Sequence, residues 1–159
     1  MDDEDVMGVQ ERMINHIWCK IAENDMGLID AVNEYRESQG KDPVTVEAPT
    51  LPFPRIPYCE AIEIVKQGGG EISWGDDIES HHCDIIAEKY PGFHFIPRWP
   101  MSMKPFYIHH KAGEEGSTGG QLSRGFDLNY GRDEMTSGGA REHRVEVLEQ
   151  NLRDVGLDP

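Results

Sequence analysis

The sequence predicts an α+β fold, in which an antiparallel sheet is flanked by helices. Apolar residues recur at spacings of three and four in three segments of the first 90 residues, as they do along amphipathic helices. Several short apolar and aromatic segments then follow between residues 93 and 137 without a helical pattern between them. Strands that succeed one another without helical crossovers pair antiparallel, which favours α+β over α/β.

The N-terminal helix is expected from Asp5 to about Glu37, and Asn24 to Gly27 allow an interruption within it. Its acidic first turn suits the positive end of the helix dipole. Its apolar face is formed by Val6, Val9, Met13, Ile14, Ile17, Trp18 and Ile21. Residues 43–57 contain five prolines in fifteen residues, which excludes a helix and predicts an extended connector.

Two more helices are expected before the strands begin. The first runs from Tyr58 to Lys66 and is ended by three glycines at positions 68–70. After a short strand candidate at residues 71–74, Asp76 is expected to cap a helix that ends before Pro91.

The strands are expected to follow in order along the rest of the chain. Residues 93–99 and 104–108 are apolar and aromatic, and residues 112–121 have the composition of a loop. Residues 126–130 alternate, with Asp127 and Asn129 on the face opposite the apolar side chains. A second short strand is expected over residues 134–137.

The segment from 126 to 144 gathers the chemical groups of a candidate ligand site. Glu134 and Ser137 supply oxygen ligands, and Gly138 with the glycine after it leaves the backbone bare. Arg141 is expected to open a final amphipathic helix that carries Val145, Leu148 and Leu152. A carboxylate, a hydroxyl and a guanidinium at one strand-to-helix junction suit a small anionic ligand beside a metal ion.

The bulk composition predicts one cytoplasmic domain. The chain has 159 residues, 37% of them hydrophobic, and it contains no apolar run long enough to span a bilayer and no N-terminal signal-peptide pattern. Three cysteines without paired spacing predict reduced, mostly buried thiols.

The net charge of −15 would repel a polyanion at long range. Nucleic acid would therefore need a local basic patch, a further domain, or an interior salt concentration that screens the repulsion. We interpret the charge as adaptation to salt in a halophilic organism; an acidic mesophilic protein is the alternative.

No zinc site is predicted, although His81-His82-Cys83 and His109-His110 contain zinc-ligand types. Neighbouring residues project in different directions, and no paired C-x-x-C or H-x-x-x-H spacing occurs. His143 is expected to pack near the candidate site.

Two segments, FIPRWPMSMKPFYI and FDLNYGRDEMTSGGAREHR, resemble the class II aminoacyl-tRNA synthetases of the aspartyl/asparaginyl subgroup, and archaeal-type aspartyl enzymes most. KPFY and SGG-x-R-E-H-R, in this order, are the specific pair. The resemblance extends from Asp5 over nearly the whole chain. It implies that residues 1–159 are part of a catalytic domain, between the second and third class II motifs, with the anticodon-binding domain absent; a fragment or truncated product, inactive alone, is therefore expected.

The resemblance also implies the chemistry and the site. Aspartate would be activated with ATP and Mg²⁺ to aspartyl-adenylate and then transferred to tRNA, in an enzyme that is a homodimer when complete. Glu134 would bind ATP and, with Ser137, Mg²⁺. Aspartate would contact Lys104, Tyr107, Ser137, Gly138 and Arg141. No residue is expected to act as a covalent or acid–base catalyst.

Three alternatives remain open from the sequence. Ala140 replaces the glutamine that archaeal enzymes usually have within SGGQR, which removes an amide near the substrate. A synthetase-like asparagine synthetase and an asparaginyl-tRNA synthetase are related alternatives, and KPFY and REHR favour the aspartyl enzymes over both. A non-catalytic paralogue is the alternative from a different class.

The charge makes one testable prediction. If screening of the −15 net charge stabilises the fold, molar KCl should raise the melting temperature of the chain, because self-repulsion destabilises the compact state. Thermal unfolding followed by circular dichroism measures this. An unchanged or lower melting temperature in KCl would refute the salt-adaptation interpretation.

Overall fold

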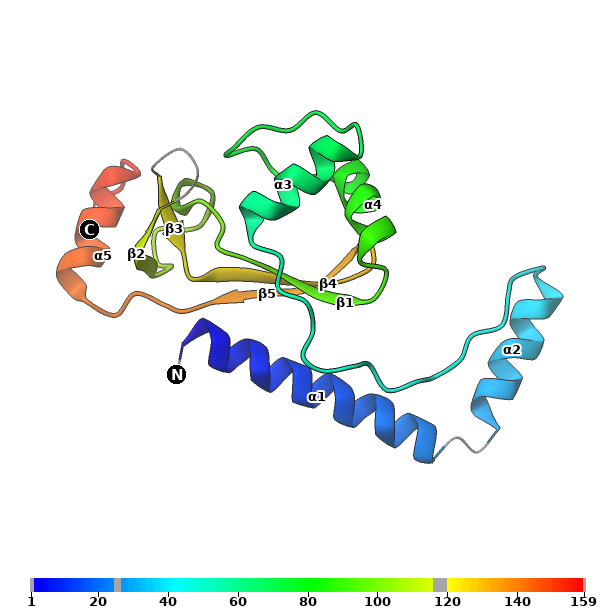
Figure 1. The fold of residues 1–159 in the computed structure, drawn as a ribbon. Coiled ribbons are helices and arrows are strands. Elements are labelled where there is room, and N and C mark those ends of the chain that lie inside the picture. The colour runs from blue at the N-terminus through cyan, green and yellow to red at the C-terminus, as the bar shows by residue number, and fades with distance from the viewer. Residues whose placement is uncertain (1, 25–26, 116–119, 159) are drawn as a thin grey trace. The chain divides into compact units, whose positions relative to one another are not determined.

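The chain consists of two compact units, shown as a computed structural model in Figure 1. The structure describes residues 2–24, 27–115 and 120–158. Residues 8–52 form the smaller unit, and residues 1–7 together with 53–159 form the larger one. None of the helices in the described part of the chain combines the length and the apolar character that crossing a membrane requires.

The smaller unit is helical. It contains most of α1 (Asp3–Glu23) and all of α2 (Leu28–Ser38), so the expected interruption occurs where it was predicted. Gly27 makes the start of α2 possible, because it adopts a φ of 77°, which side chains disfavour. The side chain of Asn33 both donates to and accepts from the backbone of Val44, at 2.9 and 2.7 Å, and so holds the predicted connector against α2.

The larger unit is built on a three-stranded antiparallel sheet in the order β1-β4-β5, which confirms the α+β prediction. Its strands are β1 (Phe93–Pro97), β4 (Gly125–Tyr130) and β5 (Asp133–Gly139). The hairpin β2 (His110–Glu115) and β3 (Gln121–Ser123) forms a second, two-stranded antiparallel sheet. Strand β4 lies between its two neighbours, and its residues 125–129 are all buried.

Two helices, α3 (Tyr58–Gln67) and α4 (Ser80–Lys89), pack together on one side of this sheet (Figure 1). Their apolar residues form the main core with residues of β1 and the segment after it. Its buried members include Tyr58, Val65, Ile86, Ile96 and Trp99. Both helices begin and end within a few residues of the predicted positions.

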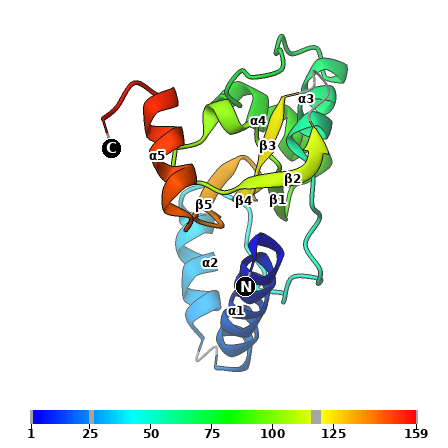
Figure 2. The same cartoon turned by 90° about the vertical axis from the view of Figure 1, so that its left-hand side faces the viewer.

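The last helix, α5 (Val145–Asp154), lies away from α3 and α4 in both views (Figures 1 and 2). The Asn151 side chain donates to the Phe106 carbonyl at 2.8 Å, which ties α5 to the segment before β2. Arg141 precedes α5 and does not belong to it, because Arg144 is the residue that caps the helix.

Several predicted local structures are wrong. Residues 71–74 form no strand, because Asp76 accepts from the Ser73 amide at 2.8 Å and closes a turn there. Asp76 therefore does not cap α4. Glu79 does, through a capping box with His82.

Residues 104–108 form a turn instead of a strand, because the Ile108 amide donates to the Pro105 carbonyl at 2.9 Å. A 3-10 turn at Met101–Met103 precedes it. The expected loop at 112–121 is largely the β2–β3 hairpin, and its residues 116–119 lie outside the described residues.

The cysteines are all free, as predicted, but they are not mostly buried. Cys59 is exposed, and Cys19 and Cys83 are half-buried.

Gly138 has a packing role that can be tested. A Cβ placed there would lie 2.8 Å from Cζ of Phe126, whose ring is fully buried and has little freedom to move. Gly138→Ala should therefore lower the free energy of unfolding by about 1–3 kcal/mol, as overpacking does. Chemical denaturation measures this, with Gly92→Ala as the control, since an added Cβ meets nothing within 4 Å there. Equal stabilities of the two variants would show that Gly138 has no packing role.

A candidate ligand-binding site between β4, β5 and the turn before β2

A cavity of about 520 Å³ opens beside β4 and β5 in the larger unit. It brings together three of the predicted site residues: Lys104, Glu134 and Ser137. The other lining residues are Asp77, Ile78, Ser80, Cys83, Ile96, Trp99, Met103, Asp127, Asn129, Arg132 and Asp133. Tyr107, Gly138 and Arg141 are not among them.

A β-bulge places Glu134 and Ser137 on the same face of the sheet. Residues three apart in a regular strand point to opposite faces. The pairing of β4 with β5 shifts between Leu128 and Asn129, so that Ser137 lies opposite Asp127 while Glu134 lies opposite Asn129. Asp127 and Asn129 are two apart and share a face, and their partners on β5 therefore share it too. A carboxylate and a hydroxyl on one face suit a hard cation such as Mg²⁺.

Asp127 is the buried charge of this cavity. It is 7% exposed, and its carboxylate lies 3.3 Å from Nζ of Lys104. The same ammonium lies 4.2 Å from the centre of the Trp99 ring, so Lys104 is held between an anion and an aromatic face. Burial raises the pKa of Asp127 to about 6, the Lys104 ammonium opposes this rise, and the Glu134 carboxylate adds to it.

Asn129 contributes an unpaired polar group to the same cavity. Its side chain is buried, and Nδ2 has no hydrogen-bond partner among the described residues. A buried donor without a partner costs about 1–3 kcal/mol, and a ligand that supplies an acceptor would offset this cost. The sequence placed Asn129 on the polar face of its strand but gave no reason to assign it to the site.

Arg141 and Tyr107 form a second group, and neither lines this cavity. The Arg141 guanidinium lies 4.4 Å from the centre of the Tyr107 ring. Arg141 bridges to Ile108, and the Glu142 amide donates to the Tyr107 carbonyl at 2.9 Å. Among the described residues, no carboxylate pairs with the exposed Arg141, so its donors are available to a ligand. Gly138 packs directly against the Phe126 ring, which leaves no room for a Cβ at this position.

Glu142, which sequence reasoning missed, fixes the segment after β5. Its carboxylate accepts from Nε and Nη2 of Arg144, at 2.9 and 2.7 Å, and from the backbone amides of His143 and Arg144. The Arg144 hydrogen bonds hold the pKa of Glu142 well below its usual range. His143 does pack near this segment, where its ring stacks on that of His109 with centroids 6.5 Å apart.

The chain belongs to the family of class II tRNA synthetases (D, K and N), whose model matches residues 1–159. It is 33% identical to the aspartate–tRNA(Asp/Asn) ligase of Archaeoglobus fulgidus over 158 residues, which are 99% of this chain and 33% of that protein. It is 35% identical to the aspartate–tRNA(Asp) ligase of Pyrococcus horikoshii, over 99% of this chain and 34% of that protein. The chain thus spans about a third of the length of these relatives.

Solved structures of the same subgroup share the fold. The crystal structure of asparaginyl-tRNA synthetase from Pyrococcus horikoshii matches with a TM-score of 0.78 and 25% identity, over 100% of this chain and 36% of that one. Aspartyl tRNA synthetase from Entamoeba histolytica matches with a TM-score of 0.79 and 22% identity, over 100% of this chain and 31% of that one.

The buried Asp127 predicts how stability depends on pH. Its pKa of about 6 in the folded chain exceeds the ordinary value of 3.8, so the folded chain binds more protons than the unfolded chain between about pH 4 and 6. The free energy of unfolding should therefore fall as the pH rises through this window. The shift corresponds to about 3 kcal/mol, which Asp127→Asn should remove.

Urea denaturation at a series of pH values between 4 and 7 tests this prediction, with the wild type and the variant compared at each pH. Asp133→Asn removes the same formal charge from an exposed position of β5 and is the matched control. A constant difference between the wild type and Asp127→Asn across the window would contradict the raised pKa.

Proposed function

We propose that this chain forms part of the catalytic domain of an aspartate–tRNA ligase. The observation that carries the proposal is the 33–35% identity to aspartate–tRNA ligases over 99% of the chain. Residues 1–159 would be the segment between the second and third class II motifs, and the complete enzyme would supply the remaining ATP contacts and the anticodon-binding domain. Binding of tRNA, dimerisation and a cytoplasmic location are proposed for that complete enzyme.

The proposed reaction depends on neutralising the negative charge of the carboxylate and the phosphates, and it needs no nucleophile or acid–base group from the protein. An oxygen of the aspartate α-carboxylate attacks the α-phosphorus of ATP, the bond from this phosphorus to the pyrophosphate oxygen breaks, and pyrophosphate leaves. No covalent enzyme intermediate forms, so the protein positions two anions and offsets their repulsion. Mg²⁺ supplies positive charge to the phosphate oxygens, and the shared face of Glu134 and Ser137 supports these two residues as its ligands.

We propose that Arg141 recognises the side-chain carboxylate of aspartate. A guanidinium binds a carboxylate through two parallel hydrogen bonds, and stacking on Tyr107 fixes the plane of this fork. Lys104 adds positive charge to the same region, but its ammonium is shared with Asp127. We therefore propose that Lys104 acts through its charge and position, while Ser137 and the bare backbone at Gly138 lie along the substrate.

Asparagine is the second candidate substrate, because the 25% identity and TM-score of 0.78 are to an asparaginyl-tRNA synthetase. Ala140 also removes a side-chain amide from this region. Two cations near the amino-acid site favour aspartate, since a neutral amide cannot offset their charge. Measuring adenylate formation with each amino acid decides between the two substrates.

Replacement of Arg141 tests the proposed function. In the complete enzyme, the bound substrate would bury its carboxylate against Arg141. Removing one partner of a buried, hydrogen-bonded charge pair costs about 2–5 kcal/mol, so Arg141→Ala should lower kcat/KM for aspartate by at least about 30-fold. Arg141→Lys should recover little activity, because an ammonium lacks the two-pronged geometry. Steady-state adenylation with aspartate varied measures both variants.

The control is Arg153→Ala, which removes an exposed arginine on α5 that is paired only with Glu149 among the described residues. It should leave adenylation unchanged. If Arg141→Ala stays within about twofold of the wild type, a difference of only about 0.4 kcal/mol, the assignment of Arg141 is wrong.

Glu134→Ala should act on a different step. If Glu134 holds Mg²⁺ on ATP, its loss should lower turnover and raise the Mg²⁺ concentration needed for half-maximal activity, with a smaller effect on the KM for aspartate. Adenylation measured with Mg²⁺ and aspartate varied separately separates these effects. A change confined to the KM for aspartate would contradict the proposed Mg²⁺ role.

A further inference from the structure

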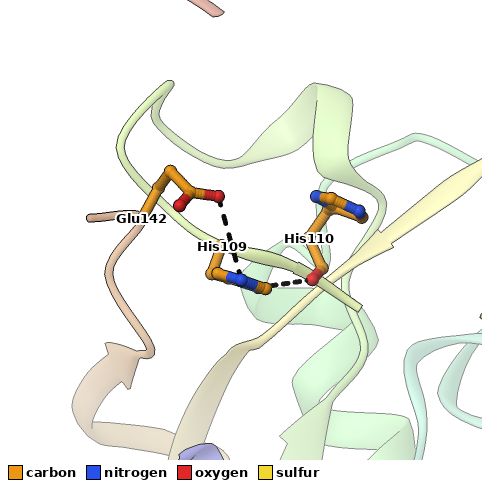
Figure 3. A group of neighbouring side chains, drawn as sticks. All are labelled: His109, His110 and Glu142. Atoms are coloured by element: carbon orange, nitrogen blue, oxygen red, sulfur yellow. Dashed lines mark hydrogen bonds and ion pairs between the residues drawn. The ribbon is translucent and has the colours of Figure 1, made fainter. Parts of the chain in front are cut away.

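The structure brings His109, which precedes β2, and His110, the first residue of β2, close to Glu142, which follows β5. Figure 3 shows the side chains of His109, His110 and Glu142 as neighbours, although the histidines and the glutamate are more than 30 residues apart in sequence. One ligand atom from each residue lies within 4.8 Å of the others. None of the three lines the cavity beside β4 and β5.

Two backbone hydrogen bonds bring these three residues together. The His109 amide donates to the Ala140 carbonyl at 2.9 Å, and the Glu142 amide donates to the Tyr107 carbonyl at 2.9 Å. These two hydrogen bonds fix the segment before β2 against the segment after β5. The histidine rings are nearly parallel, with an interplanar angle of 8° and centroids 5.4 Å apart.

His109 is held in the tautomer that a metal ligand needs. Its Nδ1 lies 2.6 Å from the backbone carbonyl of His110. A carbonyl can only accept a hydrogen bond, so Nδ1 carries the proton and the neutral ring keeps a lone pair on Nε2. Metal-binding histidines are commonly oriented by such a contact from the other ring nitrogen. Nε2 lies 3.8 Å from Oε2 of Glu142.

Glu142 retains a lone pair on the correct oxygen. Its Oε1 accepts from the amides of His143 and Arg144 and from Nε of Arg144. Its Oε2 accepts only from Nη2 of Arg144 among the described residues, and it is the oxygen that faces His109. The side chain of Glu142 is 1% exposed and fixed by these contacts, so it presents a preorganised anionic ligand.

We propose that His109, His110 and Glu142 form a binding site for a divalent transition-metal ion, with zinc as the ion that fits best. Two imidazole nitrogens and one carboxylate oxygen are a set that zinc uses in three-ligand sites, with water in the fourth position. With bonds of about 2.1 Å, ligand atoms in a tetrahedral site lie about 3.4 Å apart, so small side-chain rotations close the site. Imidazole ligands favour zinc, copper or nickel over Mg²⁺.

This proposal does not depend on the ligase function and concerns a site separate from the one proposed for Mg²⁺. One zinc ion should bind per chain, and it should remain bound in excess Mg²⁺. Because the bridged segments also carry Tyr107 and Arg141, the metal would stiffen the region that holds them. The sequence predicted no zinc site, because neighbouring residues project in different directions and no paired ligand spacing occurs. Glu142, which completes this cluster, is distant from the histidines in sequence.

Isothermal titration of the 159-residue chain with zinc chloride tests the proposal, with an excess of magnesium chloride present. The wild type should bind one equivalent, and His109→Ala and His110→Ala should each weaken binding by about 100-fold or more, since even loss of an outer contact to a metal ligand costs 10–100-fold. His81→Ala is the matched control, because it removes an exposed histidine from the other histidine pair. It should bind as the wild type does.

A second measurement needs no variant. Cobalt(II) bound to the wild type should give the intense visible absorption of a four-coordinate site, and equimolar zinc should displace it. Weak absorption of an octahedral ion, no stoichiometric binding, binding that survives both replacements, or binding lost in His81→Ala would each overturn the proposal.

Discussion

The larger unit depends on the central strand β4, which is buried on both faces although one face is polar. One face buries Phe126 and Leu128, and the other face, which it shares with Ile96 of β1, buries Asp127 and Asn129. A buried carboxylate is costly unless a cation offsets it. Lys104 supplies that cation from the turn before β2, and its ammonium also lies over the face of the Trp99 ring. The polar face of β4 thereby lines the cavity.

The bulge in β5 completes this face. It turns Glu134 and Ser137 to the same side of the sheet as Asp127 and Asn129, so four polar side chains from two strands converge. Gly138 then lets β5 lie against the Phe126 ring, and the chain continues to Arg141 beside Tyr107. The strand pair that builds the core therefore also positions the proposed ligands of Mg²⁺ and aspartate.

The sequence predicted the elements whose pattern is local. Periodicity located α3, α4 and β4 correctly, and the prolines located the connector, because each signal arises from residues close in the chain. It failed where the outcome depended on a few specific hydrogen bonds. The turn at residues 104–108 has a strand-like composition, yet the contact between Ile108 and Pro105 decides its shape.

The site was predictable in part for the same reason. The resemblance named six site residues. Lys104, Glu134 and Ser137 line the cavity, whereas Tyr107, Gly138 and Arg141 do not. The bulge, the burial of Asp127 and the unpaired amide of Asn129 depend on register and packing, which no local pattern encodes. The cluster of Glu142 with His109 was missed because its members are distant in sequence.

We propose that this face and Arg141 together bind aspartyl-adenylate in the complete enzyme. The most direct measurement is a crystal structure of the complete enzyme with a non-hydrolysable aspartyl-adenylate analogue and Mg²⁺. The side-chain carboxylate should lie on Arg141, and Mg²⁺ should lie between the phosphate mimic and the oxygens of Glu134 and Ser137. An analogue bound with its carboxylate away from Arg141 and its phosphate mimic away from β5 would contradict it.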